Sequence, residues 1–245
     1  RAASDVGGTF TDLVYFNIDE QTGEVRSVEA EKAHTTPPNF EKGVADAFSK
    51  AGVSLADVEF FAHGTTVVIN ALTERKGVKT GLITTQGFRD ILEIARGNRP
   101  DFFNLKYQKP EPFIPRYLRR EIAGRMNYKG EVVKPLDLSG IDPILEDFRN
   151  EGVETIAVCL LHSYANPIHE IEIAEHIREI WPEVSVVASH EISREWREYE
   201  RTSTAVLSAY VHPIAKGYLA SLDEKLTARG LSGKPLIMRS NGGVA

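Results

Sequence analysis

Hydrophobic and polar positions follow one pattern at the start of the chain. Before residue 35, apolar residues come in short runs separated by turn residues, as in the run LVYF at 13–16. A second run, 25–33, alternates weakly, and Gly23 lies between the two. Short β-rich runs bounded by glycine are typical of strands joined by tight turns. The pattern predicts the order strand, turn, strand, strand.

After residue 38 the pattern changes to helices alternating with strands. Apolar residues spaced three or four positions apart predict a helix over 39–52, which Gly52 ends. Further strands are predicted over 58–62, 79–84, 155–161 and 184–188, and further helices over 66–76, 141–150 and 166–180. Three strands joined by turns, followed by strand–helix alternation, indicate an α/β domain with a mixed sheet and flanking helices.

Residues 96–135 follow neither pattern. Between Arg96 and Arg125 the chain has eight basic residues, three acidic residues, four prolines and five aromatic residues. This is too long and too aromatic for a simple connector. Two interpretations remain open: an irregular segment packed on the surface, or a loop that lines a site for an anionic group or docks a partner.

The composition changes again near residue 190. From Ser193 onward the chain is strongly helical, with charged residues up to Arg201 and small or apolar residues after it. We therefore predict one domain over 1–190 and a second, mostly helical one over 191–245. The sequence begins without methionine and stops just after a Gly-Gly turn, so we expect a piece of a longer protein.

Composition and charge narrow the class of protein. The net charge is −6 with 42% hydrophobic residues, whereas nucleic-acid and membrane-surface proteins carry a basic excess, so neither partner is expected. The single cysteine, Cys159, lies in the apolar run TIAVCLL and is interpreted as a buried thiol. Because that run is too short to cross a bilayer and no secretory signal precedes it, a cytoplasmic protein is expected.

The first turn of the chain, DVGGTFTD at 5–12, carries more polar groups than a hairpin needs. Gly7 and Gly8 permit close approach to the main chain, and successive amides in such a turn form a cavity suited to phosphate. Thr9 and Thr11 add hydroxyl donors, and Asp5 is an oxygen ligand of the kind that Mg²⁺ prefers. The alternative is an ordinary glycine turn that happens to follow an acid.

Other nucleotide and metal motifs fail. There is no GxGxxG, and Gly233-Lys234 is followed by Pro235 where a P-loop needs serine or threonine. The segment HEIEIAEH has the wrong spacing for a zinc-binding HExxH helix, so His169 and His176 are interpreted as exposed helix residues. The hairpin is therefore the best candidate for a nucleotide-binding motif in this sequence.

Five segments taken in order resemble the hydantoinase A/oxoprolinase family. They are DVGGTFTD, HGTTVVINALTERKG, TGLITTQGFRDILEIARGNRPDFFNL, REYERTSTAV and RSNGG. The resemblance implies the ribonuclease-H-like fold of actin-like ATPases and sugar kinases, which begins with a β-hairpin phosphate loop. It also implies use of ATP with Mg²⁺, a B-type partner subunit or domain, a small-molecule substrate and an oligomeric assembly.

The resemblance also suggests roles for individual residues. Asp5 would orient a metal-bound water. Four hairpin residues and three residues of the strand-to-helix turn that opens the second family segment would bind phosphate: Gly7, Gly8, Thr9, Thr11, Gly64, Thr65 and Thr66. The helix after that turn would direct its N-terminal amides at an anion. Asp12 is a second acid or simply closes the turn, and His63 either donates to a phosphate or substrate oxygen or makes a structural hydrogen bond.

Two further sets of residues come from the resemblance. Arg96, Asn98 and Arg99 are expected to contact substrate. The arginines of the REYERTSTAV region, Arg194, Arg197 and Arg201, are interpreted as a solvated helix face.

Family members use ATP to activate a carbonyl, so the leading hypothesis is the ATP-using subunit of a cyclic-amide hydrolase. The corresponding subunit of a ketone carboxylase is the alternative with the same fold, and a noncatalytic nucleotide-binding module is a third, because fold does not dictate function. The family's second phosphate loop and adenosine segment do not occur before Ala245. We therefore expect residues 1–245 alone to bind Mg-ATP weakly or not at all.

Overall fold

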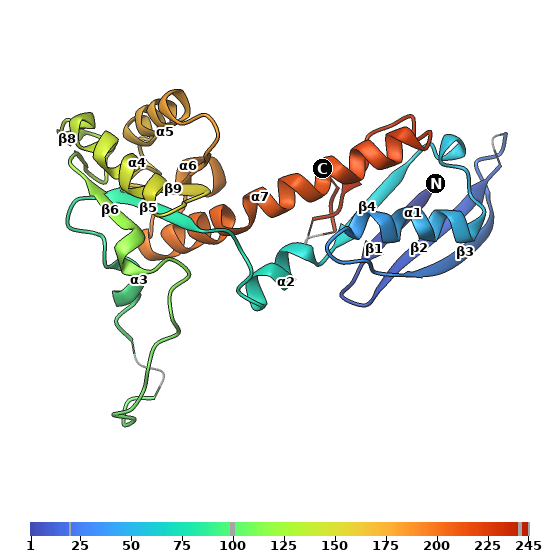
Figure 1. Cartoon of the computed structure of the whole chain (residues 1–245), viewed down its shortest axis with the longest axis horizontal. Coiled ribbons are helices and arrows are strands. Elements are labelled where there is room, and N and C mark those ends of the chain that lie inside the picture. The colour runs from blue at the N-terminus through green and yellow to red at the C-terminus, as the bar shows by residue number, and fades with distance from the viewer. Residues whose placement is uncertain (20, 99–100, 240–241, 245) are drawn as a thin grey trace. The chain divides into compact units, whose positions relative to one another are not determined.

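The computed structural model describes residues 1–19, 21–98, 101–239 and 242–244. The chain forms two compact units (Figure 1). Unit 1 comprises residues 1–76 and 214–245, and unit 2 comprises residues 77–213. The long helix α7 (Glu198–Ala228) contributes to both, and Pro213 within it marks the change from one unit to the other.

Unit 1 contains a five-stranded mixed sheet. In chain order its elements are β1 (Ala2–Val6), β2 (Phe10–Ile18), β3 (Val25–His34), α1 (Phe40–Ala51), a 3₁₀ turn (Leu55–Asp57), β4 (Phe61–Thr65), α2 (Val67–Thr73), the second half of α7, and β11 (Leu236–Ile237). The strand order is β11-β4-β1-β2-β3. Strands β1, β2 and β3 form an antiparallel meander, whereas β4 is parallel to β1 and β11 is parallel to β4.

The core of unit 1 lies on one face of this sheet. Leu13 of β2 packs with Val44 and Phe48 of α1 and with Leu222 and Leu226 of α7. Side chains of neighbouring strand residues point to opposite faces, so Ser4 and Leu13 are buried while Asp5 and Asp12 are exposed. The polar residues of the first turn are thus kept out of the core by the strand period.

Unit 2 contains a separate four-stranded parallel sheet in the order β10-β9-β5-β6. Its elements are β5 (Thr80–Thr85), α3 (Ile91–Ile94), a 3₁₀ turn (Arg116–Leu118), β6 (Arg119–Ile122), the hairpin β7 (Arg125–Met126) and β8 (Val132–Lys134), a 3₁₀ turn (Leu138–Gly140), α4 (Ile141–Asn150), β9 (Thr155–Cys159), α5 (Ile168–Ile180), β10 (Ser185–Ala188), α6 (Ser189–Ile192) and the first half of α7. Every residue of β5 and β9 is buried, as in parallel sheets covered on both faces.

The predicted elements are confirmed in kind, with three differences. The chain has a mixed sheet and a second, parallel sheet, because β5 starts a new sheet beside β9 instead of joining β4. The strand expected over 58–62 begins at Phe61, since Leu55–Asp57 form a 3₁₀ turn before it. The irregular segment 96–135 hides strand β6, which pairs with β5.

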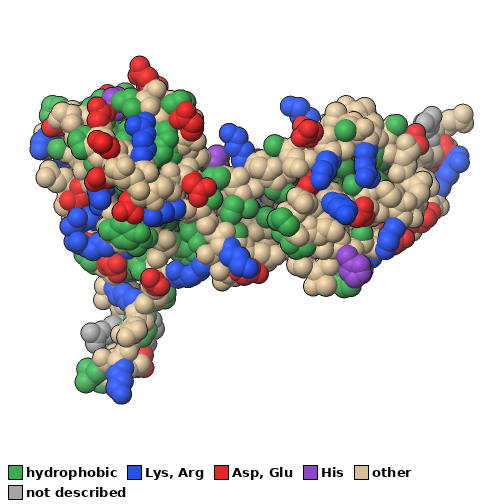
Figure 2. All heavy atoms as spheres, viewed as in Figure 1, with side chains coloured by type: hydrophobic (Ala, Val, Ile, Leu, Met, Phe, Trp, Pro, Cys, Tyr) green, Lys and Arg blue, Asp and Glu red, His purple; other side chains and the backbone are tan. Residues whose placement is uncertain are grey.

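The segment between α3 and β6 has two parts. Ile114 and Leu118 are buried in the core of unit 2, so this part is packed. Phe102, Phe103 and Leu105 are 76%, 96% and 92% exposed. Figure 2 shows hydrophobic and basic side chains together on this projecting segment.

The units defined by contacts do not follow the composition change near residue 190. That boundary divides regions of sequence, and it stays a prediction. No helix among the described residues is long and apolar enough to cross a membrane.

Candidate functional site at the glycine hairpin

The turn between β1 and β2 is held rigidly at its base. The Gly7 amide donates to the Phe10 carbonyl at 3.0 Å, and a Cβ at Gly7 would come within 3.2 Å of that oxygen. From the segment after β3, the Thr35 amide donates to the Thr9 carbonyl at 3.0 Å and its hydroxyl donates to the Gly7 carbonyl at 2.9 Å. The base of the hairpin is therefore fixed from both sides.

The tip of the same turn is open. Gly8 and Thr9 are exposed, and in the part of the chain that the structure describes their amides donate to no protein acceptor. Asn70 of α2 flanks this tip, since a Cβ at Gly8 would lie 4.0 Å from its Nδ2 atom. Two free amides beside a side-chain amide donor make a concave surface suited to anionic oxygens. Asn70 was missed by the sequence analysis, although it lies one helical turn after Thr66.

Asp5 and Asp12 lie side by side on the exposed face of the sheet. They are directly opposite each other in the β1–β2 register, and Asp5 is opposite Gly64 in the β1–β4 register. A Cβ at Gly64 would lie 3.1 Å from Asp5 Oδ1, so glycine leaves this carboxylate room. Asp12 pairs with exposed Lys32 at 3.1 Å. No cluster of three or more His, Cys, Asp or Glu suited to a metal occurs among the described residues.

Thr11 does not belong to the exposed surface. Its side chain is fully buried, and its Oγ1 lies 3.3 Å from Thr35 Oγ1. A Cβ at Gly43 of α1 would come within 2.8 Å of the same hydroxyl. Thr11 was expected to bind phosphate, but the strand period turns it toward α1, where it supports the hairpin.

His63 is fully buried, and both of its ring nitrogens are engaged. Nδ1 lies 2.7 Å from Ser4 Oγ, and Nε2 lies 2.6 Å from the Tyr218 hydroxyl. Burial lowers the pKa of His63 to about 4, so the ring is neutral at pH 7. This geometry supports the structural hydrogen bond over direct donation to phosphate. Burial also raises the pKa of Tyr218, and the charges of Glu41 and Asp5 add to that rise.

The first amides of the turn from β4 to α2 donate hydrogen bonds within the protein. The Thr66 amide and hydroxyl both donate to the Val6 carbonyl, at 3.0 and 3.1 Å. The Val67 amide donates to Thr65 Oγ1 at 3.2 Å. The expectation that these N-terminal amides point at an anion therefore does not hold for Thr66 and Val67. Gly64 and Thr65 are half-buried beside the hairpin.

The segment that leaves β11 reaches the same edge of the sheet. Because β11 is parallel to β4, the chain leaving β11 emerges beside the β4–α2 turn, and the Met238 amide donates to the His63 carbonyl at 2.8 Å. The Gly242 amide donates to the Arg239 carbonyl at 2.9 Å. Arg239 is exposed. The carboxyl ends of parallel strands form the usual ligand edge of α/β proteins, so this segment belongs to the candidate site.

The residues expected to contact substrate belong to unit 2. Arg96 forms an ion pair with Glu200 at 2.5 Å, and Asn98 is exposed. Arg99 lies outside the described residues. Substrate contact by these three stays a prediction.

The expected solvated face of arginines is wrong for Arg201, which is 1% exposed. Its Nε donates to Ser189 Oγ at 3.1 Å and its NH2 group to the Leu160 carbonyl at 2.5 Å. Ser189 Oγ donates in turn to Glu170 at 2.7 Å. Glu170 is fully buried and also accepts from the Leu160 amide at 2.7 Å and from the His190 amide at 3.0 Å. Arg194 and Arg197 are exposed as expected.

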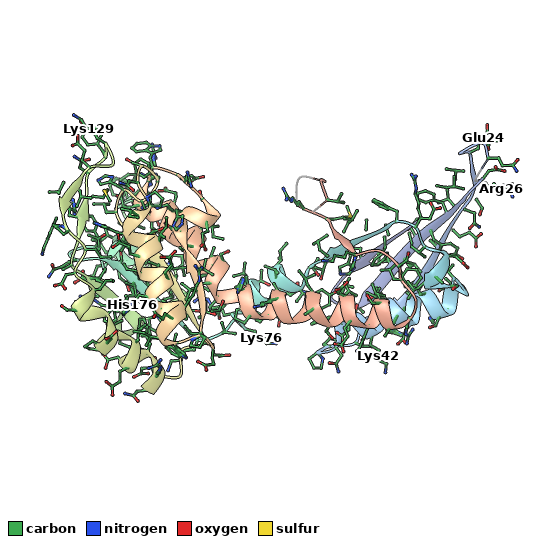
Figure 3. All side chains as sticks on the ribbon, turned by 90° about the horizontal axis from the view of Figure 1, so that it is seen from above. Glu24, Arg26, Lys42, Lys76, Lys129 and His176 are labelled. Carbon is green, nitrogen blue, oxygen red and sulfur yellow. The ribbon has the colours of Figure 1, made fainter. Side chains whose placement is uncertain are left out.

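A buried, charged network therefore closes the carboxyl edge of β9 and β10. Cys159 beside it is a buried thiol, as predicted, whose pKa burial raises. His169 is buried, contrary to the expectation of an exposed helix residue. His176 of α5, labelled in Figure 3, is partly exposed and pairs with Asp142 at 3.0 Å.

These observations define an α/β protein whose first sheet carries an open glycine hairpin at its carboxyl edge. The family model for the hydantoinase/oxoprolinase N-terminal region matches residues 1–181, and the hydantoinase/oxoprolinase model matches residues 201–245. The chain belongs to the hydantoinase/oxoprolinase family.

Two relatives and one solved structure illustrate the similarity. The caprolactamase subunit alpha of Pseudomonas jessenii is 35% identical over all of this chain, which spans 36% of that protein. The crystal structure of the ATP-dependent caprolactamase from the same organism matches with a TM-score of 0.85 over 100% of this chain and 36% of that one. 5-Oxoprolinase 1 of Arabidopsis thaliana is 30% identical, with 100% of this chain and 21% of that protein covered.

The nucleotide-free acetone carboxylase structure, from work on ATP-dependent acetone carboxylation, is 26% identical. Its TM-score is 0.85 over 100% of this chain and 36% of that one. The chain thus spans about a third, or less, of the relatives that it matches.

Proposed function

We propose that this chain forms the phosphate-binding part of an enzyme that uses ATP to open a cyclic amide. The open hairpin tip at Gly8 and Thr9, beside the exposed carboxylate of Asp5, is the observation that carries the proposal. The match to an ATP-dependent caprolactamase over the whole chain supports the reaction class. Unit 1 would then be the first half of an actin-like ATPase fold, and the hairpin its phosphate loop.

The hairpin residues bind and orient the phosphates in this proposal. The amides of Gly8 and Thr9 donate to phosphate oxygens, while Gly7 keeps the backbone close at the base. Thr11, Thr65 and Thr66 hold the surrounding turns, since their hydroxyls are engaged with protein atoms. Phosphoryl transfer depends on positioning and charge neutralisation, which a rigid turn supplies.

The residues present fit Mg²⁺ bound together with ATP. Mg²⁺ is usually held by one or two carboxylates, with waters and substrate phosphates completing its shell, and Gly64 leaves open space against Asp5. Asp5 would hold the ion through water, with Asp12 on the same face as a second carboxylate. When bound, Mg²⁺ neutralises negative charge on the phosphates.

His63 is proposed as a positioning residue. Its ring links Ser4, the residue before Asp5, to Tyr218 of α7. Because the ring is neutral and buried, it fixes the end of β1 without moving a proton during the reaction.

Phosphorylation explains why ATP is needed. An amide carbonyl is a poor electrophile, and its nitrogen is a poor leaving group. In the proposed reaction the terminal phosphorus–oxygen bond of ATP breaks and a new one forms to the carbonyl oxygen, releasing ADP. A first water then adds to the ring carbon, and the ring nitrogen takes a proton as the carbon–nitrogen bond breaks, which leaves an acyl phosphate. A second water hydrolyses this acyl phosphate, releasing phosphate and the ring-opened carboxylate.

A B-type subunit or domain would complete the enzyme. The caprolactamase relative is named as a subunit, and the chain spans 36% of it, so further parts of the active site come from elsewhere. The region after residue 190 would begin the next family domain.

The test is phosphate release from Mg-ATP by the full-length protein with its B-type partner. Hydantoin, 5-oxoproline and caprolactam are compared with ketones plus bicarbonate. We expect a cyclic amide to stimulate release, and Asp5→Asn to abolish the stimulation. Asp57→Asn, an exposed acid outside the candidate site, is the matched control and should keep it. Unchanged turnover in Asp5→Asn overturns the role of Asp5.

A ketone carboxylase subunit is the second candidate. The structural match to acetone carboxylase, with a TM-score of 0.85, favours it. Stimulation by ketone plus bicarbonate alone would keep the phosphate site and replace the reaction. Phosphate release that no substrate stimulates would favour the noncatalytic module.

A further inference from the structure

A second concave site lies in unit 1, on the face of the sheet that α1 and α7 cover. It is a cavity of about 200 Å³ between the start of α1, the start of α2 and the part of α7 that follows Pro213. Its apolar walls are Phe40, Val67, Ile214 and the ring of Tyr218. Phe40 and Tyr218 meet edge to face, with centroids 6.0 Å apart. A few polar groups on mostly apolar walls are typical of small-molecule sites.

Gly217 helps to form this cavity. It lies inside α7, where glycine costs about 1 kcal/mol relative to alanine, yet its φ is not in the left-handed region and no turn requires it. A Cβ built there meets no atom within 4 Å. A glycine at an interior helix position that faces open space leaves room for something other than this chain's own side chains.

The polar groups of the cavity suit an amide. Glu41 is 4% exposed, and its Oε1 accepts from Lys225 Nζ at 2.5 Å, so its charge is balanced from outside the cavity lining. Burial alone would raise the pKa of Glu41, but Lys225 and Ser221 bind the charged form and lower it overall. An ionised carboxylate has several acceptor positions, so it can still accept an amide N–H. Asn39 supplies a donor for a carbonyl.

Contacts through buried residues link the cavity to the candidate phosphate site. Tyr218, in its wall, is hydrogen-bonded to His63, whose other ring nitrogen contacts Ser4, the residue before Asp5 in β1. Val67, also in the wall, donates its amide to Thr65 of the β4–α2 turn. The start of α1 follows Thr35, which holds the hairpin base.

We infer that this cavity binds the cyclic amide itself, as an uncharged ring whose N–H donates to Glu41 and whose methylenes lie against Phe40, Val67 and Ile214. The inference rests on the proposed function. It adds a selectivity: the buried carboxylate of Glu41 disfavours a ring that carries a carboxylate of its own. Uncharged caprolactam or hydantoin is therefore preferred to 5-oxoproline.

The experiment fills the cavity without removing any existing contact. In the full-length protein with its partner, Gly217→Leu places a side chain in the open space and improves helix propensity, so the thermal midpoint should not fall. We expect the KM for the preferred uncharged cyclic amide to rise at least tenfold, with the KM for ATP changed less than twofold. Gly217→Ala adds one methyl group and is the graded variant. Gly140→Leu in unit 2, where a Cβ also meets open space, is the matched control.

A second measurement tests the ligand class directly. Binding of caprolactam and of 5-oxoproline to the full-length protein is followed by calorimetry without ATP, for the unsubstituted protein and for Glu41→Gln. We expect caprolactam to bind at least tenfold more tightly than 5-oxoproline, and Glu41→Gln to reduce this ratio.

The outcomes separate the two proposals. If a cyclic amide stimulates phosphate release and Gly217→Leu leaves its KM unchanged, the proposed function stands and the cavity is not the substrate site. If only ketone plus bicarbonate stimulates release, the proposed function fails, and the amide assignment of the cavity fails with it. A preference for 5-oxoproline overturns the selectivity even if Gly217→Leu raises KM.

Discussion

The carboxyl edges of the two sheets are built in opposite ways. In unit 1 the edge of β1, β4 and β11 carries a hairpin whose tip is exposed, with Asp5 and the Gly8 and Thr9 amides facing outward. In unit 2 the edge of β9 and β10 is closed by Glu170 and Arg201, both buried and bonded to main-chain groups. Ligands usually bind at such an edge in α/β proteins.

This difference shows how polar groups that could bind a ligand can be distinguished from polar groups that stabilise the fold. Polar groups whose hydrogen bonds are all made within the protein stabilise the fold, whereas donors left open at an exposed edge are available to a ligand. By this criterion the Glu170 and Arg201 network supports unit 2, and the glycine hairpin is the candidate site. Substitutions in unit 2 should therefore change stability, and those at the hairpin should change activity.

The largest effect is expected for Glu170→Ala. Removing this buried carboxylate leaves the Leu160 and His190 amides and the Ser189 hydroxyl without their acceptor. The free energy of unfolding should fall by about 3–5 kcal/mol, measured by chemical denaturation. Glu172→Ala, on the exposed side of the same helix, should change it by less than about 0.5 kcal/mol. Equal losses in the two variants would show that the network does not support unit 2.

His63 should make the stability of unit 1 depend on pH. Its pKa is about 4 in the folded protein and 6.5 when free, so protons bind the unfolded chain more readily. The neutral ring makes its full contribution to the free energy of unfolding above pH 6.5, and this contribution is lost as the pH falls toward 4. The pKa difference between the folded and unfolded states corresponds to about 3 kcal/mol of stability.

The check is the free energy of unfolding of His63→Gln at several pH values, because glutamine does not titrate. The difference in free energy of unfolding between the unsubstituted protein and this variant should become smaller as the pH is lowered from 7 to 4. His34→Gln, at an exposed histidine of the same unit, is the control. A gap that stays constant over this range would mean that His63 is not buried as a neutral ring.

The smallest effect on stability is expected at the hairpin. Asp5 is exposed, and we expect Asp5→Asn to change the free energy of unfolding by less than about 0.5 kcal/mol. The same variant abolishes substrate-stimulated phosphate release in the proposed function. A stability loss of more than about 2 kcal/mol would instead place Asp5 among the groups that support the fold.

Much of the fold was predictable because its signals are local. The strand–turn–strand opening, the helix ended by Gly52 and the alternating elements that follow depend on periodicity and turn residues. The assignment of strands to two sheets was not predictable, because pairing of β5 with β9 joins residues about 75 positions apart. β6 was hidden since its sequence RREI has no apolar alternation of its own.

The candidate site was predicted in outline and corrected in detail. The hairpin with Asp5 and the turn from β4 to α2 fall within the quoted motifs. The inward side chains of Thr11 and His63 depend on which face of the sheet α1 and α7 cover, and that is a tertiary property. Arg201 looked solvated because its neighbours in sequence are charged, yet its partners come from Ser189 and Leu160.

The division of the chain has a consequence for synthesis. Unit 2 is one continuous stretch, 77–213, whereas unit 1 needs residues from both sides of it. On the ribosome, the N-terminal strands must wait while unit 2 emerges, and β11 joins β4 only once residues 236 and 237 are free. Domains generally fold as units during translation. The unit that is made second is therefore the first to be complete, and unit 1, which carries the glycine hairpin, is finished after the inserted unit that interrupts it.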